Sequence, residues 1–315
     1  MTTVLIASSA PGEGRSAVLA GLGASLADAK RSVRLLRVRA GEGGDAAAED
    51  DAAAFAAVPG CDAPRGAVSG QEALAQAGGV DVCLVEARAG DATALAQRLA
   101  ARVVLVSART DDESLAVLVA AGRSLGDALL GVIVTRRNPT RLAGARAAIE
   151  ARGLNCLGVL PEDRQLAGPT LRELAEALHA TRLVDGADED EAVESVMLAP
   201  ISADPGQPYF LQEQGHKAVI ARTDKMDLHL AALATEPDCL ILTSARPIHP
   251  YLLDRVRGSD AAVTLLHSPE GTVRTVELLD ELLGHTRFSG RRKIERATEL
   301  VRTHIDIDAL AQALS

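Results

Sequence analysis

The stretch Thr3-Val-Leu-Ile-Ala-Ser-Ser-Ala-Pro-Gly-Glu-Gly-Arg-Ser16 decides the fold of the first half of this chain. Its apolar run, residues 4–7, is typical of a buried strand, and a glycine-containing turn follows. An Ala- and Leu-rich segment over residues 16–30 then predicts a helix. Phosphate-binding loops connect a strand to the helix that follows it, as this turn is expected to do.

The turn keeps part of the phosphate-loop pattern G-x-x-x-x-G-K-[ST]. Gly14, Arg15 and Ser16 stand at its G-K-S end, so arginine replaces the usual lysine. Ser8 or Ser9, depending on loop length, replaces the first glycine. A guanidinium is a planar fork and not a compact ammonium, so it fits poorly where lysine follows a migrating phosphoryl group.

The other loop residues differ in whether they favour or oppose binding of a phosphate. Gly12 keeps the backbone flexible, whereas Pro11 removes an amide donor and Glu13 adds a negative charge beside the expected anion. The loop predicts nucleotide binding without efficient hydrolysis, and a simple strand-to-helix turn remains the alternative. The nucleotide-binding residues expected in the loop are Gly12, Glu13, Gly14, Arg15 and Ser16.

Short apolar runs alternate with helical patterns through the first half, which predicts an α/β fold with a parallel sheet covered on both faces. Ligands of such sheets bind at the carboxyl ends of the strands. Strands are expected at residues 4–7, 33–38, 82–86, 103–106, 131–134 and 157–160. Helices are expected at residues 114–125, 140–152 and 170–178, the last with a capping box from Thr170 and Glu173.

Charged residues follow two of these strands. Glu86 ends the strand at residues 82–86, where it and Ser16 could hold Mg²⁺, and a surface carboxylate is the alternative. Arg37 and Arg39 follow the second strand, facing either an anionic ligand or solvent.

Two polar stretches suggest how the chain is divided. Residues 40–64 are rich in Ala, Gly and Asp and predict a mobile surface loop. The acidic stretch 185–194 predicts a solvated linker. We therefore expect domains at residues 1–184 and 195–315, and the second repeats the strand–helix alternation. Its expected strands are residues 196–199, 218–221, 239–243 and 262–266, and its helices are residues 227–234, 249–256, 271–283, 291–301 and 306–315.

The first half resembles the dethiobiotin synthetase-type P-loop domain. The similarity rests on the loop, on the strand Val-Asp-Val-Cys-Leu-Val-Glu86 and on Leu157-Gly-Val-Leu-Pro-Glu-Asp-Arg-Gln-Leu166. The resemblance implies that Pro161 lies in the nucleotide-base region and that ATP or ADP binds with Mg²⁺. Those synthetases carry lysines where this chain has Arg15 and Arg37, so their carboxylation chemistry is not expected here.

The second half resembles the DRTGG domain. The D-R-T-D element of that family falls on residues 223–227, and its L-T-G-G turn falls on Leu242-Thr-Ser-Ala245. Both glycines are missing, so any position with positive φ would be strained. A strand ending in His267 is expected opposite this turn, which predicts a small-ligand pocket. The residues expected to line that pocket are Asp224, Thr243, Ser244 and His267.

The two halves together resemble the N-terminal regulatory part of long-form phosphate acetyltransferase and stand-alone phosphotransacetylase-like proteins. The resemblance implies a role in acetyl-CoA or acetyl-phosphate metabolism, with a protein partner there. The acetyltransferase catalytic domain would need several hundred further residues, so we expect no acetyl transfer from these 315 residues.

Composition narrows the class of protein. The net charge of −10 argues against nucleic acid or anionic membrane as the main partner. Four widely spaced cysteines without a C-x-x-C pair indicate a reducing compartment, and no apolar run reaches membrane-spanning length. The seven histidines show no metal-ligand spacing, so no zinc is expected. We expect a cytoplasmic protein.

The preferred hypothesis is a regulatory or sensor protein that binds a nucleotide or a phosphate-bearing metabolite through the loop. The second domain would mediate self-association, giving a homo-oligomer, or bind a small metabolite. The chain is expected not to be an enzyme. One alternative is an ATP-dependent ligase of the dethiobiotin synthetase type, and another is a structural interaction module with a vestigial loop.

Overall fold

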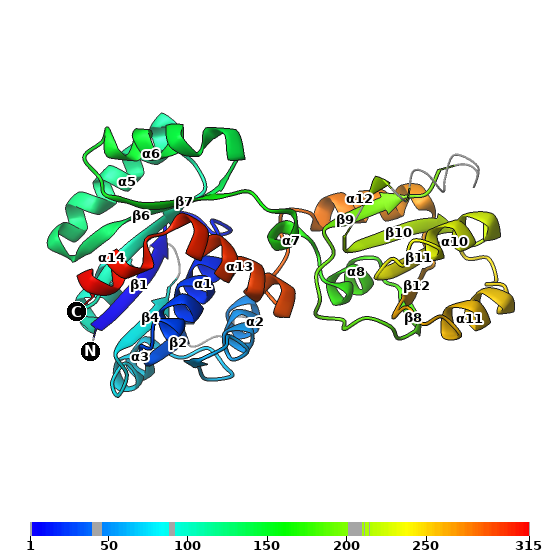
Figure 1. The fold of residues 1–315 in the computed structure, drawn as a ribbon, viewed down its shortest axis with the longest axis horizontal. Coiled ribbons are helices and arrows are strands. Elements are labelled where there is room, and N and C mark those ends of the chain that lie inside the picture. Colours follow the sequence, from blue (N-terminus) through cyan, green and yellow to red (C-terminus); the bar gives the residue numbers. More distant parts are fainter. Residues whose placement is uncertain are drawn as a thin grey trace. The chain divides into compact units, whose positions relative to one another are not determined.

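The computed structural model describes residues 2–39, 46–87, 92–200, 210, 212–213 and 215–314. The chain forms two compact units (Figure 1). Unit 1 consists of Met1–Asp163 and Lys293–Ser315, and unit 2 consists of Arg164–Arg292.

The described residues of unit 1 form a seven-stranded parallel sheet in the order β3-β2-β4-β1-β5-β6-β7. Its central strands are nearly all apolar and fully buried, as a sheet covered on both faces requires. The expected α/β fold is confirmed. The strands are β1 (Thr2–Ser8), β2 (Val33–Arg37), β3 (Cys61–Asp62), β4 (Val82–Glu86), β5 (Arg102–Ser107), β6 (Leu129–Arg137) and β7 (Cys156–Pro161).

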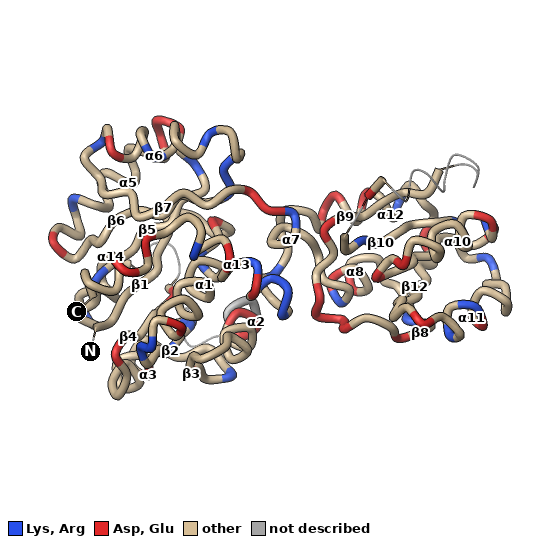
Figure 2. The backbone as a smooth tube through the Cα atoms, viewed as in Figure 1, with Lys and Arg blue, Asp and Glu red and all other residues tan. Residues whose placement is uncertain are grey.

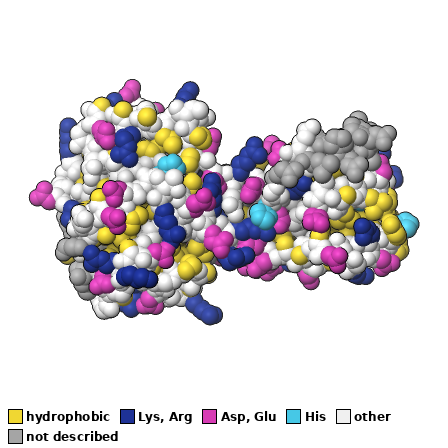
Figure 3. All heavy atoms as spheres, viewed as in Figure 1, with side chains coloured by type: hydrophobic (Ala, Val, Ile, Leu, Met, Phe, Trp, Pro, Cys, Tyr) yellow, Lys and Arg dark blue, Asp and Glu magenta, His cyan; other side chains and the backbone are white. Residues whose placement is uncertain are grey.

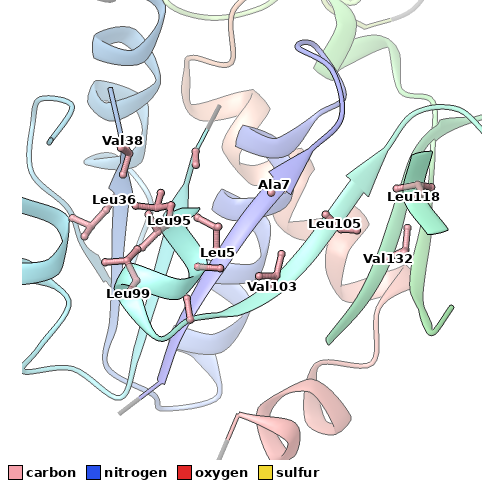
Figure 4. Packing of buried hydrophobic residues seen from close by; sticks show 14 of the residues in the cluster. Leu5, Ala7, Leu36, Val38, Leu95, Leu99, Val103, Leu105, Leu118 and Val132 are labelled. Atoms are coloured by element: carbon pink, nitrogen blue, oxygen red, sulfur yellow. The ribbon is translucent and has the colours of Figure 1, made fainter. Parts of the chain in front are cut away.

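Helices cover both faces of this sheet. On one face, Leu5 and Leu36 lie near Leu95 and Leu99, and Leu118 lies beside Val132 in the same apolar cluster (Figure 4). The helices of unit 1 are α1 (Arg15–Asp28), α2 (Ala46–Phe55), α3 (Gly70–Gln76), α4 (Ala92–Leu99), α5 (Asp112–Leu125), α6 (Leu142–Glu150), α13 (Arg291–His304, from its third residue on) and α14 (Ile307–Ala313).

The last helices pack on the first domain, contrary to the expected domain at residues 195–315. A Cβ atom added to Gly21 on α1 would lie 2.6 Å from Val301 on α13, so glycine permits this close approach. Thr2 Oγ1 donates a hydrogen bond to Leu314 O (2.8 Å), and Gly158 pairs with Ile305. The amphipathic pattern predicted these helices but not the sheet that they cover.

The expected mobile loop at residues 40–64 is wrong in part, because α2 and β3 lie within it. Ala52 and Phe55 are each only 1% exposed. Alanine has the highest helix propensity, and burial of these side chains fixes the helix on the sheet. Residues 40–45 lie outside the described part of the chain.

Unit 2 contains a smaller sheet in the order β8-β12-β11-β10-β9, where β8 runs antiparallel to β12 and the other pairs are parallel. The strands are β8 (Thr181–Val184), β9 (Ser195–Leu198), β10 (Lys217–Arg222), β11 (Cys239–Thr243) and β12 (Thr264–Ser268). The helices are α7 (Arg164–Ala167), α8 (Leu171–Ala177), α10 (Met226–Leu233), α11 (Pro250–Arg257) and α12 (Thr272–Leu282).

Two apolar cores lie on either side of this second sheet. Residues of α8 and α12 pack against one face, and residues of α10 and α11 pack against the other. The predicted capping box begins α8: Glu173 N donates to Thr170 Oγ1 (3.1 Å), and Thr170 N donates to Glu173 Oε2 (2.9 Å).

The acidic stretch 185–194 is part of the folded unit 2 and not a solvated linker. Ala192 and Val193 are fully buried, and Val193 N donates to Pro169 O (2.9 Å). The carboxylates that suggested a solvated segment are paired, because Asp190 accepts from Arg172 Nε (2.9 Å). The chain therefore passes from unit 1 to unit 2 after residue 163.

Acidic and basic residues are interspersed along both units (Figure 2). On the face shown in Figure 3 the two kinds of charge lie side by side over much of the surface. Among the described residues, no helix has the length and apolar character needed to cross a membrane.

Candidate functional site

The candidate site lies at the carboxyl ends of β1, β2 and β4. The strand register pairs Ile6 of β1 with Glu86 of β4, and Arg37 of β2 with the same Glu86. The loop that follows β1 leads into α1, so the sheet brings the loop, Arg37 and Glu86 together; the sequence placed the loop and Glu86 at this edge but left Arg37 facing either a ligand or solvent. Ligands of parallel sheets bind at this end.

The loop has the backbone conformation that its glycines allow. Gly12 (φ 73°) and Gly14 (φ 84°) are both left-handed, a region that other residues enter at a cost. Gly14 is the N-cap of α1, and no side chain caps the helix there. The first amides of α1 are therefore left to bind an external anion or water. Thr135 Oγ1 on β6 donates to Glu13 O (2.8 Å) and anchors the loop.

The Glu13 side chain folds back onto the loop. Its Oε2 atom accepts hydrogen bonds from Ala10 N (3.2 Å) and Ser9 Oγ (3.3 Å), and the residue is only 5% exposed. A carboxylate thus satisfies one of the loop's own amide donors. Any phosphate bound to this loop would have to share it with a negative charge.

Arg15 does not extend freely from the loop. Its Nη1 atom donates to Ala87 O (2.5 Å), and its Nε atom lies 3.5 Å from Glu86 Oε1. The side chain is 8% exposed, and this burial lowers the pKa of its guanidinium from the ordinary value, although the nearby Glu86 charge opposes the shift. Arg15 is therefore held against the end of β4.

Arg37 and Ser16 converge on the same carboxylate. Arg37 Nη1 lies 3.1 Å from Glu86 Oε1, and Ser16 Oγ donates to that oxygen at 3.3 Å. Glu86 is 1% exposed and Arg37 is 5% exposed. Within the described residues, Glu86 Oε2 accepts no hydrogen bond, and Nε and Nη1 of Arg37 donate none despite their ion pairs.

Asp51 completes this group, and sequence reasoning did not find it. It comes from α2, and its Oδ2 atom lies 3.4 Å from Arg37 Nε. Burial raises the pKa of the Asp51 carboxyl to about 7, and the Glu86 charge adds to the shift. Asp51 is surrounded in sequence by Ala and acidic residues, so only a helix assignment for this stretch could have pointed to it. We call Arg15, Arg37, Asp51 and Glu86 the charge cluster.

Mg²⁺ fits this set of donors poorly. Ser16, Asp51 and Glu86 supply oxygen ligands of the right chemistry. The two arginines of the charge cluster, however, already match its two carboxylates. A divalent ion would therefore have to enter beside two guanidiniums that already pair with these carboxylates, and their repulsion would offset the attraction of Asp51 and Glu86. Among the described residues, no group of three or more His, Cys, Asp or Glu side chains could hold a metal ion.

Pro161 lies apart from the charge cluster. It ends β7, where it pairs with Arg137 of β6. Two strands, β5 and β6, separate β7 from β1 in the sheet. Pro161 thus shares the carboxyl end of the sheet with the loop but does not belong to the group around Glu86.

The four pocket residues predicted in unit 2 also lie at or just beyond the carboxyl ends of its strands. His267 on β12 contacts the residue after β11, because its Nε2 atom lies 2.8 Å from Ser244 O. Ser244 Oγ lies 2.9 Å from Thr223 Oγ1, and Thr243 Oγ1 lies 3.0 Å from Thr272 Oγ1. We call these hydrogen-bonded groups, most of them hydroxyls, the hydroxyl network.

Two of the predicted pocket residues, Asp224 and Ser244, have features that the sequence did not predict. The carboxylate of Asp224 is held by Arg222 (2.8 Å) and Arg246 (3.0 Å). Ser244 has a φ of 94°, in the left-handed region where the family pattern has glycine. The backbone of this turn therefore has a conformation that favours glycine, although serine stands there.

Comparison with known families confirms the resemblance of the second half to the DRTGG domain. Residues 173–282 match the model of the DRTGG domain, which lies within unit 2. This match covers about a third of the chain. The matched segment begins within α8 and includes β8, both before the expected start at residue 195, and it ends at residue 282, before the helices that belong to unit 1.

Solved structures with detectable similarity are distant in sequence. The CBS and DRTGG domains of the regulatory region of Clostridium perfringens pyrophosphatase, complexed with the activator diadenosine tetraphosphate, are 10% identical, with a TM-score of 0.32 over 50% of this chain and 76% of that chain. The MinC:MinD cell division complex of Aquifex aeolicus is 17% identical, with a TM-score of 0.39 over 53% and 83%. Apo McdA of Cyanothece is 19% identical, with a TM-score of 0.35 over 52% and 87%.

Proposed function

We propose that this chain is a regulatory protein whose loop at residues 8–16 binds a nucleotide or phosphate-bearing metabolite without transferring its phosphate. The observation that carries the proposal is the placement of Arg15. This residue stands at the lysine position of the phosphate-loop pattern, and its guanidinium is bonded to Ala87 O and paired with Glu86.

Binding is supported by the geometry of the loop. Left-handed glycines lead into the uncapped N-terminus of α1, where backbone amides and the helix dipole favour an anion. Arg37 lies at the neighbouring strand end with donors that are buried and make no hydrogen bond among the described residues. A phosphate oxygen would satisfy these donors.

Turnover is opposed by the same contacts. Phosphoryl transfer depends almost entirely on positioning and on stabilising the charge that develops on the moving group. Arg15 is held at the end of β4, and the Glu13 carboxylate lies within the loop. We therefore expect ATP to bind and dissociate unchanged, and the ligase hypothesis loses the lysine-based chemistry on which it depends.

The proposed regulatory role belongs to unit 2. In the pyrophosphatase of Clostridium perfringens, a DRTGG domain occurs in a regulatory region that is complexed with a nucleotide activator. We propose that unit 2 of this chain mediates self-association or binds a metabolite, in the cytoplasm. A link to acetyl-CoA or acetyl-phosphate metabolism, with a protein partner there, rests on the sequence resemblance alone.

A second candidate function is an interaction module whose loop needs no ligand. The contact that favours it is the one between Glu13 and Ala10 N, because the loop then fills one of its own donors. In that case nucleotide would not bind, and the oligomeric state of the protein would be the same with and without nucleotide.

Calorimetric titration with ATP and ADP, combined with a phosphate-release assay, separates these functions. The proposal predicts saturable binding with negligible release. Arg15→Ala should weaken binding roughly tenfold or more, as expected for loss of a charge near the phosphate site. The exposed Arg123, at the far end of α5, provides the matched control variant Arg123→Ala, which should leave affinity unchanged. Sustained phosphate release would favour the ligase, and absence of binding at millimolar nucleotide would favour the interaction module.

A further inference from the structure

The charges around the loop bear on whether nucleotide binding there needs a metal ion. The inference below rests on the proposed function. We propose that the loop holds its phosphate ligand without a divalent cation, and that Arg15 and Arg37 occupy the place that a metal ion would take. The nucleotide bound in the cell would then be the free anion and not its magnesium complex.

Glu86, the carboxylate expected to ligate Mg²⁺, already has other partners. Its Oε1 atom already has three neighbours that carry positive charge or donate a hydrogen bond: Arg37 Nη1 at 3.1 Å, Arg15 Nε at 3.5 Å and Ser16 Oγ at 3.3 Å. Ser16, the other expected ligand, is thus hydrogen-bonded to the oxygen that a cation would share with it. A metal ion would have to displace these contacts before it could bind.

The charges around that carboxylate are also matched. Arg37 joins Glu86 to Asp51, whose Oδ2 atom lies 3.4 Å from Arg37 Nε. Two positive and two negative groups thus lie together, and Arg15, Arg37 and Glu86 are each less than a tenth exposed. Buried ions are tolerated when their charges are matched, and a divalent ion would upset that match.

The arginines can act in place of a metal. A guanidinium keeps its charge in proteins and presents several donors in a plane that suits phosphate oxygens. Nη1 and Nε of Arg37 are buried and face Glu86 (3.1 Å) and Asp51 (3.4 Å), but neither contact has the geometry of a hydrogen bond, so a phosphate oxygen could accept one there. The positive groups beside the loop are therefore side chains of the chain itself.

The direct test is a calorimetric titration of the full chain with ADP, once with Mg²⁺ and once with EDTA. We expect dissociation constants that agree within about threefold, since the arginines and not the metal supply the positive charge. Binding that weakens tenfold or more in EDTA would overturn the metal-free site and leave the proposed function intact. Absence of binding in both buffers would overturn both.

A variant sharpens the test. Arg37→Gln removes one positive charge, so ADP binding should become weaker in EDTA and recover at least fivefold when Mg²⁺ is added. Arg123→Gln, the matched control, should behave as the wild type. Circular dichroism would establish that each variant is folded. If Arg37→Gln binds ADP as tightly in EDTA as in Mg²⁺, Arg37 does not replace a metal.

Direct metal binding gives a readout that needs no nucleotide. In a Mn²⁺ titration of the wild-type protein followed by electron paramagnetic resonance, we expect no stoichiometric site. One tightly bound Mn²⁺ per wild-type chain, lost in Glu86→Gln under conditions where circular dichroism shows this variant to be folded, would overturn the inference, and the wild-type result can be read even if Arg37→Gln fails to fold.

Discussion

The two sheets place opposite chemistries at the same topological position. At the carboxyl ends of β1, β2 and β4, the charge cluster buries full charges that neutralise one another. At the carboxyl ends of β10, β11 and β12, the hydroxyl network joins the hydroxyls of Thr223 and Ser244, and the ring of His267 contacts Ser244 O. The fold provides the position, and the residues at the strand ends decide which ligand it can suit.

This difference has a consequence for stability. Removing one member of a buried ion-pair group leaves an uncompensated charge, whereas removing one hydroxyl from a neutral network leaves a smaller defect. The chain also offers a way to observe the units separately. It has no Trp and two Tyr, at positions 209 and 251, both within unit 2. Tyrosine fluorescence therefore reports unit 2, and hydrogen exchange of peptides reports unit 1.

The largest effect is expected from Glu86→Gln in the charge cluster. Without the carboxylate, Arg15 and Arg37 remain buried with insufficient negative charge, and unit 1 should lose about 3–5 kcal/mol of stability. Hydrogen exchange and urea unfolding followed by circular dichroism would measure this. Asp112→Asn, at a carboxylate with a 93% exposed side chain, is the control and should cost less than about 1 kcal/mol. A loss confined to the tyrosine signal would contradict the prediction.

A pH dependence is expected beside the hydroxyl network. His229 is fully buried, and its Nε2 atom lies 2.8 Å from Arg222 O, so the neutral ring donates there while Nδ1 has no partner among the described residues. Burial lowers the pKa of His229 below its ordinary value of 6.5. The unfolded chain then binds more protons than the folded one, and unit 2 loses stability as pH falls below about 6.5.

Urea unfolding of unit 2, followed by tyrosine fluorescence, should show a loss on the order of 1–2 kcal/mol between pH 7.5 and pH 5. In His229→Gln this pH-dependent part should disappear. The exposed His285 provides the control, since His285→Gln should keep the wild-type dependence. Equal pH profiles for wild type and His229→Gln would show that His229 titrates alike in both states.

A smaller effect is expected at Glu13, in the loop beside the charge cluster. Glu13→Gln keeps an oxygen for Ala10 N but removes a negative charge from the proposed phosphate site. ADP affinity should rise by roughly three- to tenfold, corresponding to about 1 kcal/mol. Calorimetry would measure it against Glu150→Gln at the end of α6. Unchanged affinity would place the bound phosphate away from this side chain.

The smallest effect is expected at Ser244 in unit 2. Its φ of 94° suits glycine, so Ser244→Gly relieves backbone strain while losing a hydrogen bond to Thr223. The net result should be a stabilisation of up to about 1 kcal/mol, whereas Ser244→Ala keeps the strain, loses the bond and should destabilise. Tyrosine-detected unfolding distinguishes the two. Equal effects of Gly and Ala would show that the backbone there is relaxed.

The sequence predicted most strands because they are short apolar runs with buried side chains, but it missed β3 and β8, which are short and only partly buried. It also placed the loop and Glu86 at the carboxyl ends of the strands, whereas for Arg37 it left solvent open as an alternative, and the strand register sets Arg37 beside Glu86. These inferences need only the periodicity of the chain and the topology of parallel sheets.

Long-range packing could not be predicted in the same way. Asp51 reaches Arg37 only because α2 folds over the sheet, and its Ala-rich sequence shows no clear periodicity. The return of residues 293–315 to unit 1 depends on Gly21 admitting Val301. In the stretch 185–194, carboxylates that suggested solvent are paired with arginines such as Arg172. Each of these depends on a partner distant in sequence.

Hydrogen exchange of the full chain, with and without saturating ADP, tests most directly whether the loop at residues 8–16 binds nucleotide. If ligand binds at the loop, peptides covering residues 8–16 and the first turn of α1 should be protected, together with the end of β4. Protection confined to peptides of unit 2, or no protection at an ADP concentration that saturates the calorimetric signal, would contradict the account.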